Sequence, residues 1–255
     1  MTHFKYSKSV KYTDLETIYA QCSGPGGLKL TEFMAEKMGV SRGERILDVG
    51  CNRGIQSCFL AKEYGVQVVG IDPWDDRMDG RPMVEHAREN ASKWGVPEMV
   101  LAQKIGLPES HYASESFDRV YSTTALEMVR NLSGEDGYLQ CLKEIRRVLK
   151  PGGVFGLGEP MHLDVPIPDD LRPYVTRDEF PWAECFRDVR HSAEEVRSAG
   201  FDLLEYGYVP DAKDWWAEYA QHDPFCKDDP QGDPLTLKID NGRWVSFGYI
   251  IARRM

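Results

Sequence analysis

Apolar and polar residues follow two alternating periods along most of the chain, and these periods predict strands and helices in turn. Short apolar runs at 45–49 and 66–71 have the length and composition of buried strands. The segment between them places apolar residues three and four positions apart, which predicts a helix that ends at Gly65. Further strand-like runs follow at 99–103, 117–122, 154–157, 203–209 and 244–252, and further helical segments at 30–38, 83–94 and 138–149.

Strands separated by helices predict parallel β-α-β units, with helices on both faces of one sheet. Ser192-Ala-Glu-Glu195 matches a capping box and predicts a helix start there, with Gly200 as its end. The fold class expected is therefore α/β, with a doubly wound sheet in a single domain over residues 1–255.

Two long stretches do not fit this alternation. Residues 160–190 are rich in proline and aromatic side chains, and residues 209–243 contain Trp215, Trp216 and Tyr219 before a polar run. Loops of this length in a compact domain are usually functional or disordered. We therefore expect both stretches to be insertions that form a lid over the functional site.

The composition is that of an ordinary globular protein. The 255 residues are 42% hydrophobic and 28% charged, with a formal net charge of -10, which makes nucleic acid an unexpected partner. No apolar run approaches the ~20 residues of a membrane span, and the N-terminus lacks the apolar core of a secretory signal. The six scattered cysteines have no metal-ligand spacing and suit reduced thiols. These features predict a cytoplasmic protein without a metal site.

The loop at 48–54 is the centre of the expected site, because ligands of open α/β sheets bind at the carboxyl ends of the strands. Gly50 allows a sharp turn, and Gly54 opens the next helix with free amides. Asp48 would repel a pyrophosphate but suits a ligand with ammonium and sulfonium groups. Asp72 ends the next strand, where an acid can accept hydrogen bonds from two ribose hydroxyls. The loop therefore favours a positively charged nucleoside.

Four motifs together resemble a known enzyme family. In order and spacing, across roughly residues 26 to 208, they resemble the class I S-adenosylmethionine-dependent methyltransferases. The resemblance implies a seven-stranded, Rossmann-like sheet whose last strand is antiparallel, with S-adenosyl-L-methionine as cofactor. The motifs are Arg45-Ile-Leu-Asp-Val-Gly-Cys-Asn-Arg-Gly54, Val69-Gly-Ile-Asp72, Phe117-Asp-Arg-Val-Tyr-Ser122 and Leu149-Lys-Pro-Gly-Gly-Val154.

The resemblance also implies a place for each cofactor-binding residue. Asn52 stands where the family has glycine, and asparagine tolerates positive φ, so the loop is expected to keep its shape. Gln103 stands where the family often has an acid. The implied positions are Asp48, Gly50, Asn52 and Gly54 around the methionine part, Asp72 on the ribose, Pro73 or Trp74 flanking the adenine, Gln103 and Lys104 at its edge, and Ser122 or Thr123 at the end of the fourth strand.

A second, shorter resemblance concerns the N-terminus. Ser23-Gly-Pro-Gly-Gly-Leu-Lys-Leu30 is similar to the segment that folds over the cofactor in phosphoethanolamine methyltransferases. The resemblance implies that residues 1–25 form an arm over the site and that Tyr19 lines the acceptor pocket. Those enzymes carry an acid where Thr124 stands, so an amine acceptor does not follow from it.

Methyl transfer is an in-line displacement in which positioning and exclusion of water matter most, and a side-chain base is needed only for a protonated nucleophile. Glu159 lies at the carboxyl end of the fifth strand, where it could orient an acceptor or act as a base with His162; capping of a local turn is an equal alternative. Glu127 has a similar place after the fourth strand. Tyr19, Glu127, Glu159 and His162 are thus the catalytic candidates.

The leading hypothesis is a methyltransferase for a small-molecule acceptor, as a monomer or a homodimer, with 160–190 and 209–243 lining the acceptor pocket. A second hypothesis is a non-catalytic module of the same fold that binds the cofactor or a partner protein. A third is a nicotinamide-dependent dehydrogenase, against which Asp48 and the missing G-x-G-x-x-G spacing argue. The acceptor itself does not follow from the sequence, because lids vary freely on this scaffold.

Overall fold

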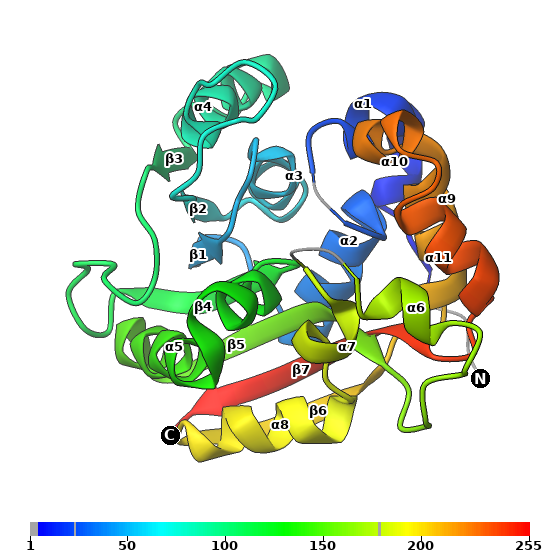
Figure 1. Ribbon diagram of the computed structural model, residues 1–255. Helices are drawn as coiled ribbons and strands as arrows, with labels where there is room; N and C mark the ends of the chain where they lie inside the picture. The colour runs from blue at the N-terminus through cyan, green and yellow to red at the C-terminus, as the bar shows by residue number, and fades with distance from the viewer. Residues whose placement is uncertain (1–4, 23, 178–179) are drawn as a thin grey trace.

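A seven-stranded sheet forms the centre of the computed structural model, which describes residues 5–22, 24–177 and 180–255 (Figure 1). In order across the sheet, the strands are β3 (Val100–Gln103), β2 (Gln67–Ile71), β1 (Arg45–Val49), β4 (Phe117–Thr123), β5 (Leu149–His162), β7 (Val245–Arg254) and β6 (Phe201–Tyr208). Neighbouring strands are parallel except that β7 is antiparallel to both β5 and β6. The α/β class and the antiparallel last strand expected from the sequence are confirmed.

Helices cover both faces of this sheet. They are η1 (Ser9–Lys11), α1 (Leu15–Tyr19), α2 (Gly27–Met38), α3 (Ile55–Tyr64), α4 (Met83–Trp94), α5 (Leu126–Val148), α6 (Arg172–Val175), α7 (Trp182–Cys185), α8 (Val189–Ser198), α9 (Ala212–His222), α10 (Pro224–Asp228) and α11 (Asp233–Asp240). Apolar residues of α2, α3 and α9 form a core on one face, and those of α5 and α8 form a core on the other. Along β1, Ile46 belongs to the first core and Leu47 to the second, because successive strand residues point to opposite faces.

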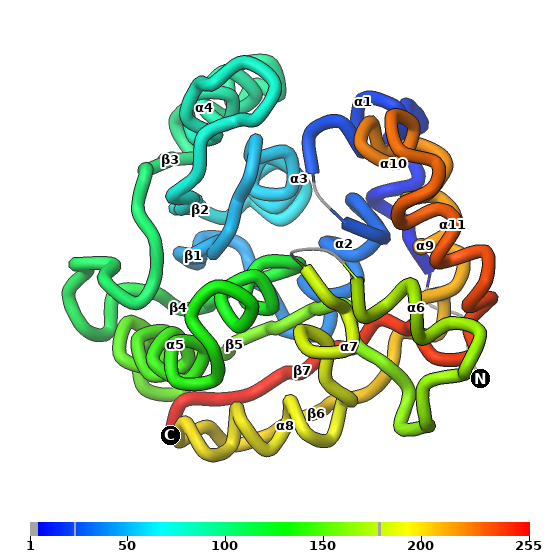
Figure 2. Tube along the Cα trace, in the orientation of Figure 1, coloured from blue at the N-terminus to red at the C-terminus, as the bar shows by residue number. Residues whose placement is uncertain are grey.

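The N-terminal segment lies beside the last helices of the chain. Helix α1 contacts α9, which also packs against α10 and α11 (Figure 2). The Tyr6 hydroxyl donates a hydrogen bond to Asp211 at 2.6 Å. The buried Glu32 carboxylate of α2 accepts hydrogen bonds from the backbone N–H groups of Lys8 and Ser9, at 2.9 and 2.6 Å. The beginning of the described chain is thereby fixed to α2 and to the region of α9.

The start of α8 differs from the sequence prediction. The helix begins at Val189, and Asp188 caps it by accepting hydrogen bonds from the N–H groups of Arg190 and His191, at 2.9 and 3.0 Å. Ser192 lies inside the helix and is fully buried. The predicted start at Ser192 is therefore wrong, because an aspartate one turn earlier provides the cap.

The stretches 160–190 and 209–243 contain short helices rather than long loops. The first carries α6 and α7, and the second carries α9, α10 and α11. Buried aromatic residues of both stretches, among them Trp182 and Trp216, pack with Trp244 in one cluster. This packing joins the two stretches into one layer beside the start of β7. Residues 178–179 of the first stretch, and residues 1–4 and 23 of the expected N-terminal arm, lie outside the described residues.

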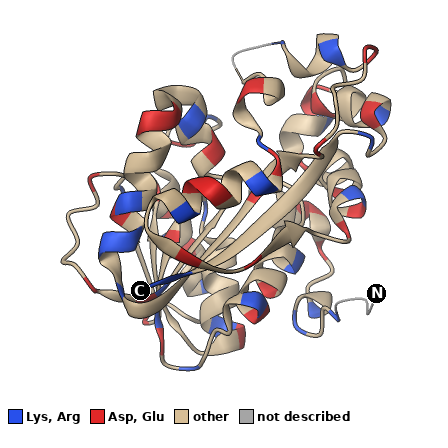
Figure 3. Cartoon of the chain, turned by 90° about the horizontal axis from the view of Figure 1, so that it is seen from below, with Lys and Arg blue, Asp and Glu red and all other residues tan. Residues whose placement is uncertain are grey.

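Charged residues of both signs are interspersed along the helices in the view of Figure 3. Ion pairs join several of them across elements, for example Arg130 of α5 with Glu195 of α8 at 2.7 Å. None of the helices in the described ranges combines the length and the apolar composition that a bilayer span needs.

Candidate functional site

The loop after β1 turns through three left-handed residues. The backbone φ angles are 77° at Gly50, 49° at Asn52 and 73° at Gly54. Glycine adopts such angles freely, and asparagine is among the few other residues that tolerate them. The sequence expectation that Asn52 takes a positive φ in place of a glycine is therefore confirmed.

Close neighbours explain why the two glycines are needed. A Cβ atom on Gly50 would lie 2.4 Å from the Cβ of Ala125, just before α5, and a Cβ on Gly54 would lie 2.6 Å from the Cβ of Ala87 in α4. The loop is thus fitted between α5 and α4, and this packing fixes its shape within the protein itself.

Asp72 connects this loop to the segment after β2. Its Oδ2 accepts a hydrogen bond from the N–H of Asn52, and its Oδ1 accepts one from the N–H of Trp74, both at 2.9 Å. Burial raises the pKa of the Asp72 carboxyl, and the two backbone N–H groups oppose that shift. A carboxylate oxygen can accept two hydrogen bonds. Asp72 therefore keeps the capacity to bind two hydroxyl groups.

Asp48 is buried beneath the loop on the α3 side, with 1% of its surface exposed. The Ser57 hydroxyl donates a hydrogen bond to its Oδ2 at 2.5 Å. Burial raises the pKa of Asp48 to about 7, and the nearby charge of Asp72 adds to this effect. A positive charge beside Asp48 would lower its pKa again. The position therefore favours a cationic ligand.

The two residues expected to flank an adenine follow Asp72 directly. Pro73 and Trp74 are exposed, and the Trp74 side chain keeps 42% of its surface accessible. An exposed indole at a strand end is an available stacking face. The structure thus places this aromatic group next to the carboxylate expected to bind a ribose.

Gln103 and Lys104, at the end of β3, already have protein partners. The Tyr112 hydroxyl donates a hydrogen bond to the Gln103 Oε1. The Lys104 ammonium pairs with the exposed Asp75 carboxylate at 2.5 Å. Both side chains lie near the strand end as expected, and contact with a ligand would add to these bonds or replace them.

Ser122 and Thr123 close β4 with hydrogen bonds inside the protein. The Ser122 hydroxyl donates to the carbonyl of Val49 at 3.2 Å. The Thr123 hydroxyl donates to the Gln56 Oε1 at 3.3 Å, and the Gln56 Nε2 donates to the carbonyl of Gly27 at 3.2 Å. These bonds tie the end of β4 to the first residue of α2, so both hydroxyls position the strand end.

Thr124 has a conformation that the sequence did not indicate. Its φ is 51°, an outlier for a β-branched residue, and its buried Oγ1 has no hydrogen-bond partner among the described residues. A Cβ atom on Gly24 would lie 2.6 Å from its Cγ2. Such strain is concentrated at functional sites. Thr124 marks the point where the N-terminal segment meets the end of β4.

Arg53 joins the loop to the same segment. Its Nη1 donates a hydrogen bond to the carbonyl of Ala20 at 2.5 Å, and its Nε donates to Asp76 at 2.8 Å. The Asn90 Nδ2 donates both to Gln21 and to the Arg53 carbonyl, each at 2.7 Å. Ala20 and Gln21 therefore lie against the loop after β1.

Asp76, Asp79 and His86 bring ligand atoms within 4.8 Å of one another, the kind of group that can hold a metal ion. Asp76 is buried and pairs with the Arg53 guanidinium. His86 Nε2 lies 3.3 Å from Asp76 Oδ2. Arg53 thus supplies the positive charge that a metal ion would bring.

Two of the four catalytic candidates come together at the ends of β4 and β5. Glu127, in the first turn of α5, is 2% exposed, and Glu159, on β5, is 1% exposed. Burial raises the pKa of both carboxyl groups, and the charge of Glu159 adds to the shift at Glu127. The geometry therefore forms a buried pair of carboxyl groups that favours one retained proton.

Two further residues of this group were not found by the sequence analysis. The Tyr138 hydroxyl lies 3.5 Å from the Glu159 Oε2, and the Arg130 guanidinium stacks on the Tyr138 ring at 3.7 Å from its centroid. Arg130 lies one helical turn from Glu127, a spacing that could have indicated it. Tyr138 opens the helical segment expected at 138–149, and its ring packs in the core on that face of the sheet.

The other two candidates lie elsewhere. The Tyr19 ring stacks on His222, and its hydroxyl donates to Glu218 of α9 at 3.4 Å. His162 stacks on Trp244 with ring centroids 4.9 Å apart. Because Glu159 and His162 are three positions apart on β5, their side chains point to opposite faces of the sheet. The pairing of these two residues expected from the sequence is therefore absent.

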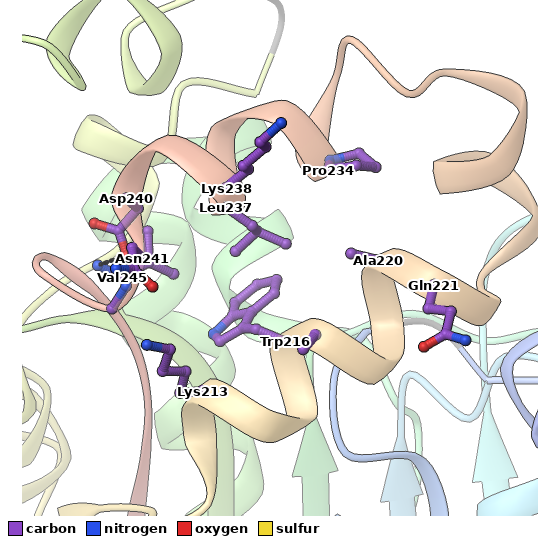
Figure 4. A pocket seen from close by; sticks show the side chains of 12 residues that line it. Lys213, Trp216, Ala220, Gln221, Pro234, Leu237, Lys238, Asp240, Asn241 and Val245 are labelled. Atoms are coloured by element: carbon purple, nitrogen blue, oxygen red, sulfur yellow. Dashed lines mark hydrogen bonds between the residues drawn. The ribbon is translucent and has the colours of Figure 1, made fainter.

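Two cavities lie along α9, away from the loop after β1. One, of about 400 Å³, lies between α9 and α11, where Trp216 and Leu237 face each other and Lys213 and Lys238 stand at the edges (Figure 4). The other, of about 540 Å³, is lined by residues of α9 together with Tyr6. Neither cavity includes Asp48, Asp72 or the carboxyl pair, so neither marks the candidate site.

Comparison with known proteins identifies a methyltransferase domain in this chain. A family model described as a methyltransferase domain matches residues 47–157. The chain is 31% identical over 187 residues to the methyltransferase GfsG of Streptomyces halstedii, an alignment that covers 70% of this chain and 60% of that protein. It is 29% identical over 178 residues to the sterol 24-C-methyltransferase ERG6B of Gibberella zeae, covering 68% and 43%. The chain spans about half the length of these curated relatives.

Solved structures share the fold. Phosphoethanolamine N-methyltransferase 2 of Haemonchus contortus, in complex with S-adenosyl-L-methionine, superposes with a TM-score of 0.74 at 19% identity, covering 99% of this chain and 60% of that one. The [4+2]-cyclase SpnF superposes with a TM-score of 0.70 at 21% identity, covering 89% and 81%. At these identities the likeness concerns the fold. The match of residues 47–157 to a methyltransferase domain and the seven-stranded sheet together give this chain the domain and the fold of the class I S-adenosylmethionine-dependent methyltransferases.

Proposed function

We propose that this chain transfers a methyl group from S-adenosyl-L-methionine to a small-molecule acceptor by in-line displacement. The observation that carries the proposal is Asp72, which bridges the left-handed loop after β1 and the exposed Trp74 while keeping lone pairs for two hydroxyl groups. The relatives support the reaction class, since their names describe methyltransferases, including enzymes for sterols.

The residues present fit this cofactor. Asp72 can bind the ribose, Trp74 offers a face to the adenine, and the raised pKa of Asp48 favours a cationic neighbour. When bound, the cofactor supplies a methyl group on a positively charged sulfur. The cofactor-binding residues proposed are Asp48, Gly50, Asn52, Gly54, Asp72, Pro73, Trp74, Gln103, Lys104, Ser122 and Thr123, the last two through the position of the strand end.

The protein's part in the reaction is to hold the acceptor in line and to exclude water. In this proposal Glu127 and Glu159 stand on the acceptor side, because they end neighbouring strands beside the loop. Tyr19 and His162 take packing roles, through their contacts with His222 and Trp244.

The parts outside the central sheet cover the site in this proposal. The contacts of Ala20 and Gly24 with the loop and with Thr124 support an arm formed by residues 1–25. The shared aromatic cluster of 160–190 and 209–243 supports a lid over the acceptor pocket.

A second candidate is a protein of this fold that binds the cofactor, or a partner, without methyl transfer. The likeness to the [4+2]-cyclase SpnF supports this second candidate, because the name of that protein describes a reaction other than methyl transfer. Titration calorimetry with S-adenosyl-L-methionine, S-adenosylhomocysteine and NAD tests cofactor choice. Incubation with methyl-labelled cofactor and a metabolite pool then tests transfer.

We expect micromolar binding of the two S-adenosyl compounds, no binding of NAD, and label in a small molecule. Binding without label in any compound would favour the second candidate, and binding of NAD alone would exclude both. A cytoplasmic location is also proposed, supported by six buried free cysteines. Light scattering during gel filtration distinguishes the monomer from the homodimer.

A further inference from the structure

The carboxyl pair of Glu127 and Glu159 has two oxygen atoms that no described protein group satisfies. Oε2 of Glu127 and Oε1 of Glu159 are fully buried and have no hydrogen-bond partner among the described residues. Buried polar atoms nearly always have such a partner, and each exception calls for an explanation. Two unsatisfied acceptors on interacting carboxyl groups are explained by a group that donates hydrogen bonds when the site is filled.

The charges around the pair indicate what kind of donor fits. Arg130 donates to Glu195 at 2.7 Å and lies 3.3 Å from Glu135, which Arg187 also contacts. His191 reaches Glu195 at 3.7 Å from the exposed edge, and Cys185 adds a thiol from α7. The ionisable groups that face the pair are thus Arg130, Tyr138, Glu195 and Cys185. Glu135, Arg187 and His191 lie behind them, in contact with Arg130, Glu135 or Glu195.

Four carboxyl groups in this cluster face two guanidinium groups. If all four carboxyl groups were ionised, two negative charges would have no counterpart in a largely buried place, which is unfavourable. Burial raises the pKa of Glu127 and of Glu195, so retained protons can supply the balance when no ligand is bound. A cationic ligand could supply it instead, and then a proton would leave the pair.

The pair also lies next to the proposed cofactor site. Glu127 follows Ala125 by two residues, and Ala125 is the residue against which Gly50 packs. Glu159 follows Gly158, whose carbonyl accepts a hydrogen bond from the Thr124 N–H at 3.0 Å. The carboxyl pair and the loop after β1 therefore flank the same strand end.

We infer that the Glu127–Glu159 pair binds the amino group of an amine acceptor and takes its proton during methyl transfer. This inference rests on the proposed function and adds the substrate class. The amine binds as an ammonium ion whose N–H groups donate to the two unsatisfied oxygens, and Arg130 remains paired with Glu195.

An ammonium N–H bond breaks, and its proton goes to the carboxylate of Glu159. The nitrogen lone pair so released forms the N–CH₃ bond, while the S–CH₃ bond breaks and its electron pair stays on sulfur. The products are the methylated ammonium ion, neutral S-adenosylhomocysteine and a protonated carboxyl group, which returns its proton to solvent after release.

The first experiment observes the pair directly by ¹³C NMR of protein labelled at the glutamate carboxyl carbons. Assignment uses Glu127→Gln and Glu159→Gln, and Glu194→Gln, an exposed glutamate of α8, is the control. The probes are methylammonium, which carries charge and N–H groups, tetramethylammonium, which carries charge alone, and methanol, which carries only a hydroxyl.

We expect methylammonium to shift the signals of both glutamates and to move their titration to lower pH by about one unit. We expect smaller effects from the other two probes, and an unchanged Glu194 signal. The inference is overturned if methylammonium leaves both signals in place, or if methanol matches its effect.

The second experiment separates this inference from the proposed function. Primary amines and the corresponding alcohols are incubated with methyl-labelled cofactor, and Glu159→Gln is expected to lower kcat on amines about 100-fold while the Kd of the cofactor stays unchanged. Label in alcohols alone would overturn the amine class and leave methyl transfer intact. Absence of cofactor binding would overturn the proposed function itself.

Discussion

The carboxylate of Asp72, at the end of β2, accepts a hydrogen bond from the backbone N–H of Asn52, in the loop after β1, at 2.9 Å. The bond uses the backbone of residue 52, so it can form whether that residue is asparagine or glycine. A second bond, from the N–H of Trp74, holds the other carboxylate oxygen. Asp72 therefore sets the relative position of two loops before any ligand binds.

Replacing Asp72 tests this role. Asp72→Ala is expected to weaken binding of S-adenosyl-L-methionine at least tenfold, because both the ribose contacts and the two backbone bonds are lost. Titration calorimetry measures the Kd, and circular dichroism checks folding. Asp75→Ala is the matched control, since Asp75 is exposed and pairs with Lys104. Equal Kd values for the wild type and Asp72→Ala would contradict the assignment.

Gly39 and Gly50 both have positive φ, but only Gly50 is crowded by a neighbouring residue. Substitutions at the two positions therefore distinguish the cost of the φ angle from the cost of a steric clash. Gly39 has φ 63°, and a Cβ atom there would have no neighbour within 4 Å. Gly50 has φ 77°, and a Cβ atom there would lie 2.4 Å from the Cβ of Ala125. Gly39→Ala is expected to lower the free energy of unfolding by about 1 kcal/mol. Gly50→Ala is expected to cost about 2–4 kcal/mol and to abolish cofactor binding, because α5 must move.

Urea denaturation of the two variants at one pH gives the comparison directly. A similar loss for both would show that the contact with Ala125 is unimportant and that only the φ angle matters. The cofactor Kd of Gly39→Ala should equal that of the wild type.

The central sheet was predictable because its strands are short apolar runs between helices with clear stops. The loop after β1 was predictable for a related reason: Gly50, Asn52 and Gly54 are residue types that tolerate positive φ. By contrast, the local sequence around a residue does not show which distant residues its side chain contacts in the fold. Tyr138 stands at the start of a predicted helix and Arg130 lies outside it, and only the fold brings both residues to Glu159.

The helical content of 209–243 was missed for another reason. Its helices are short, and two of them begin with proline in the first turn after an acidic or polar segment, a pattern that also describes turns. Glu159 and His162 do not pair, because residues three positions apart on an extended strand point to opposite faces of the sheet. Their spacing alone does not show this orientation.

The identity of the residue that caps the start of α8 can be tested by mutation. Asp188→Ala is expected to lower the free energy of unfolding by about 1 kcal/mol, because the N–H groups of Arg190 and His191 lose their acceptor. Ser192→Ala is expected to be neutral or slightly stabilising, because its buried hydroxyl oxygen has no partner among the described residues. Thermal and urea unfolding measure the loss of stability in both variants. A larger loss for Ser192→Ala than for Asp188→Ala would show that Ser192 is the N-cap after all.

The buried Asp48 predicts a dependence of stability on pH. Its pKa is raised from 3.8 to about 7, so the folded protein holds this proton more tightly than the unfolded chain does. The resulting stabilisation is complete below about pH 4 and is lost as the pH rises towards 7 and above. A change of this size corresponds to at most roughly 4 kcal/mol.

Asp48→Asn removes this titration. Relative to the wild type, the variant is expected to gain stability between pH 4 and pH 8, by up to about 4 kcal/mol, when the cofactor is absent. Its affinity for the cationic cofactor should fall, because the carboxylate that favours a positive charge is gone. Urea denaturation of both proteins at several pH values measures the difference in free energy of unfolding, and subtraction removes contributions from Glu127 and Glu159. A difference that stays constant with pH would show that Asp48 is ionised throughout this range in the folded protein.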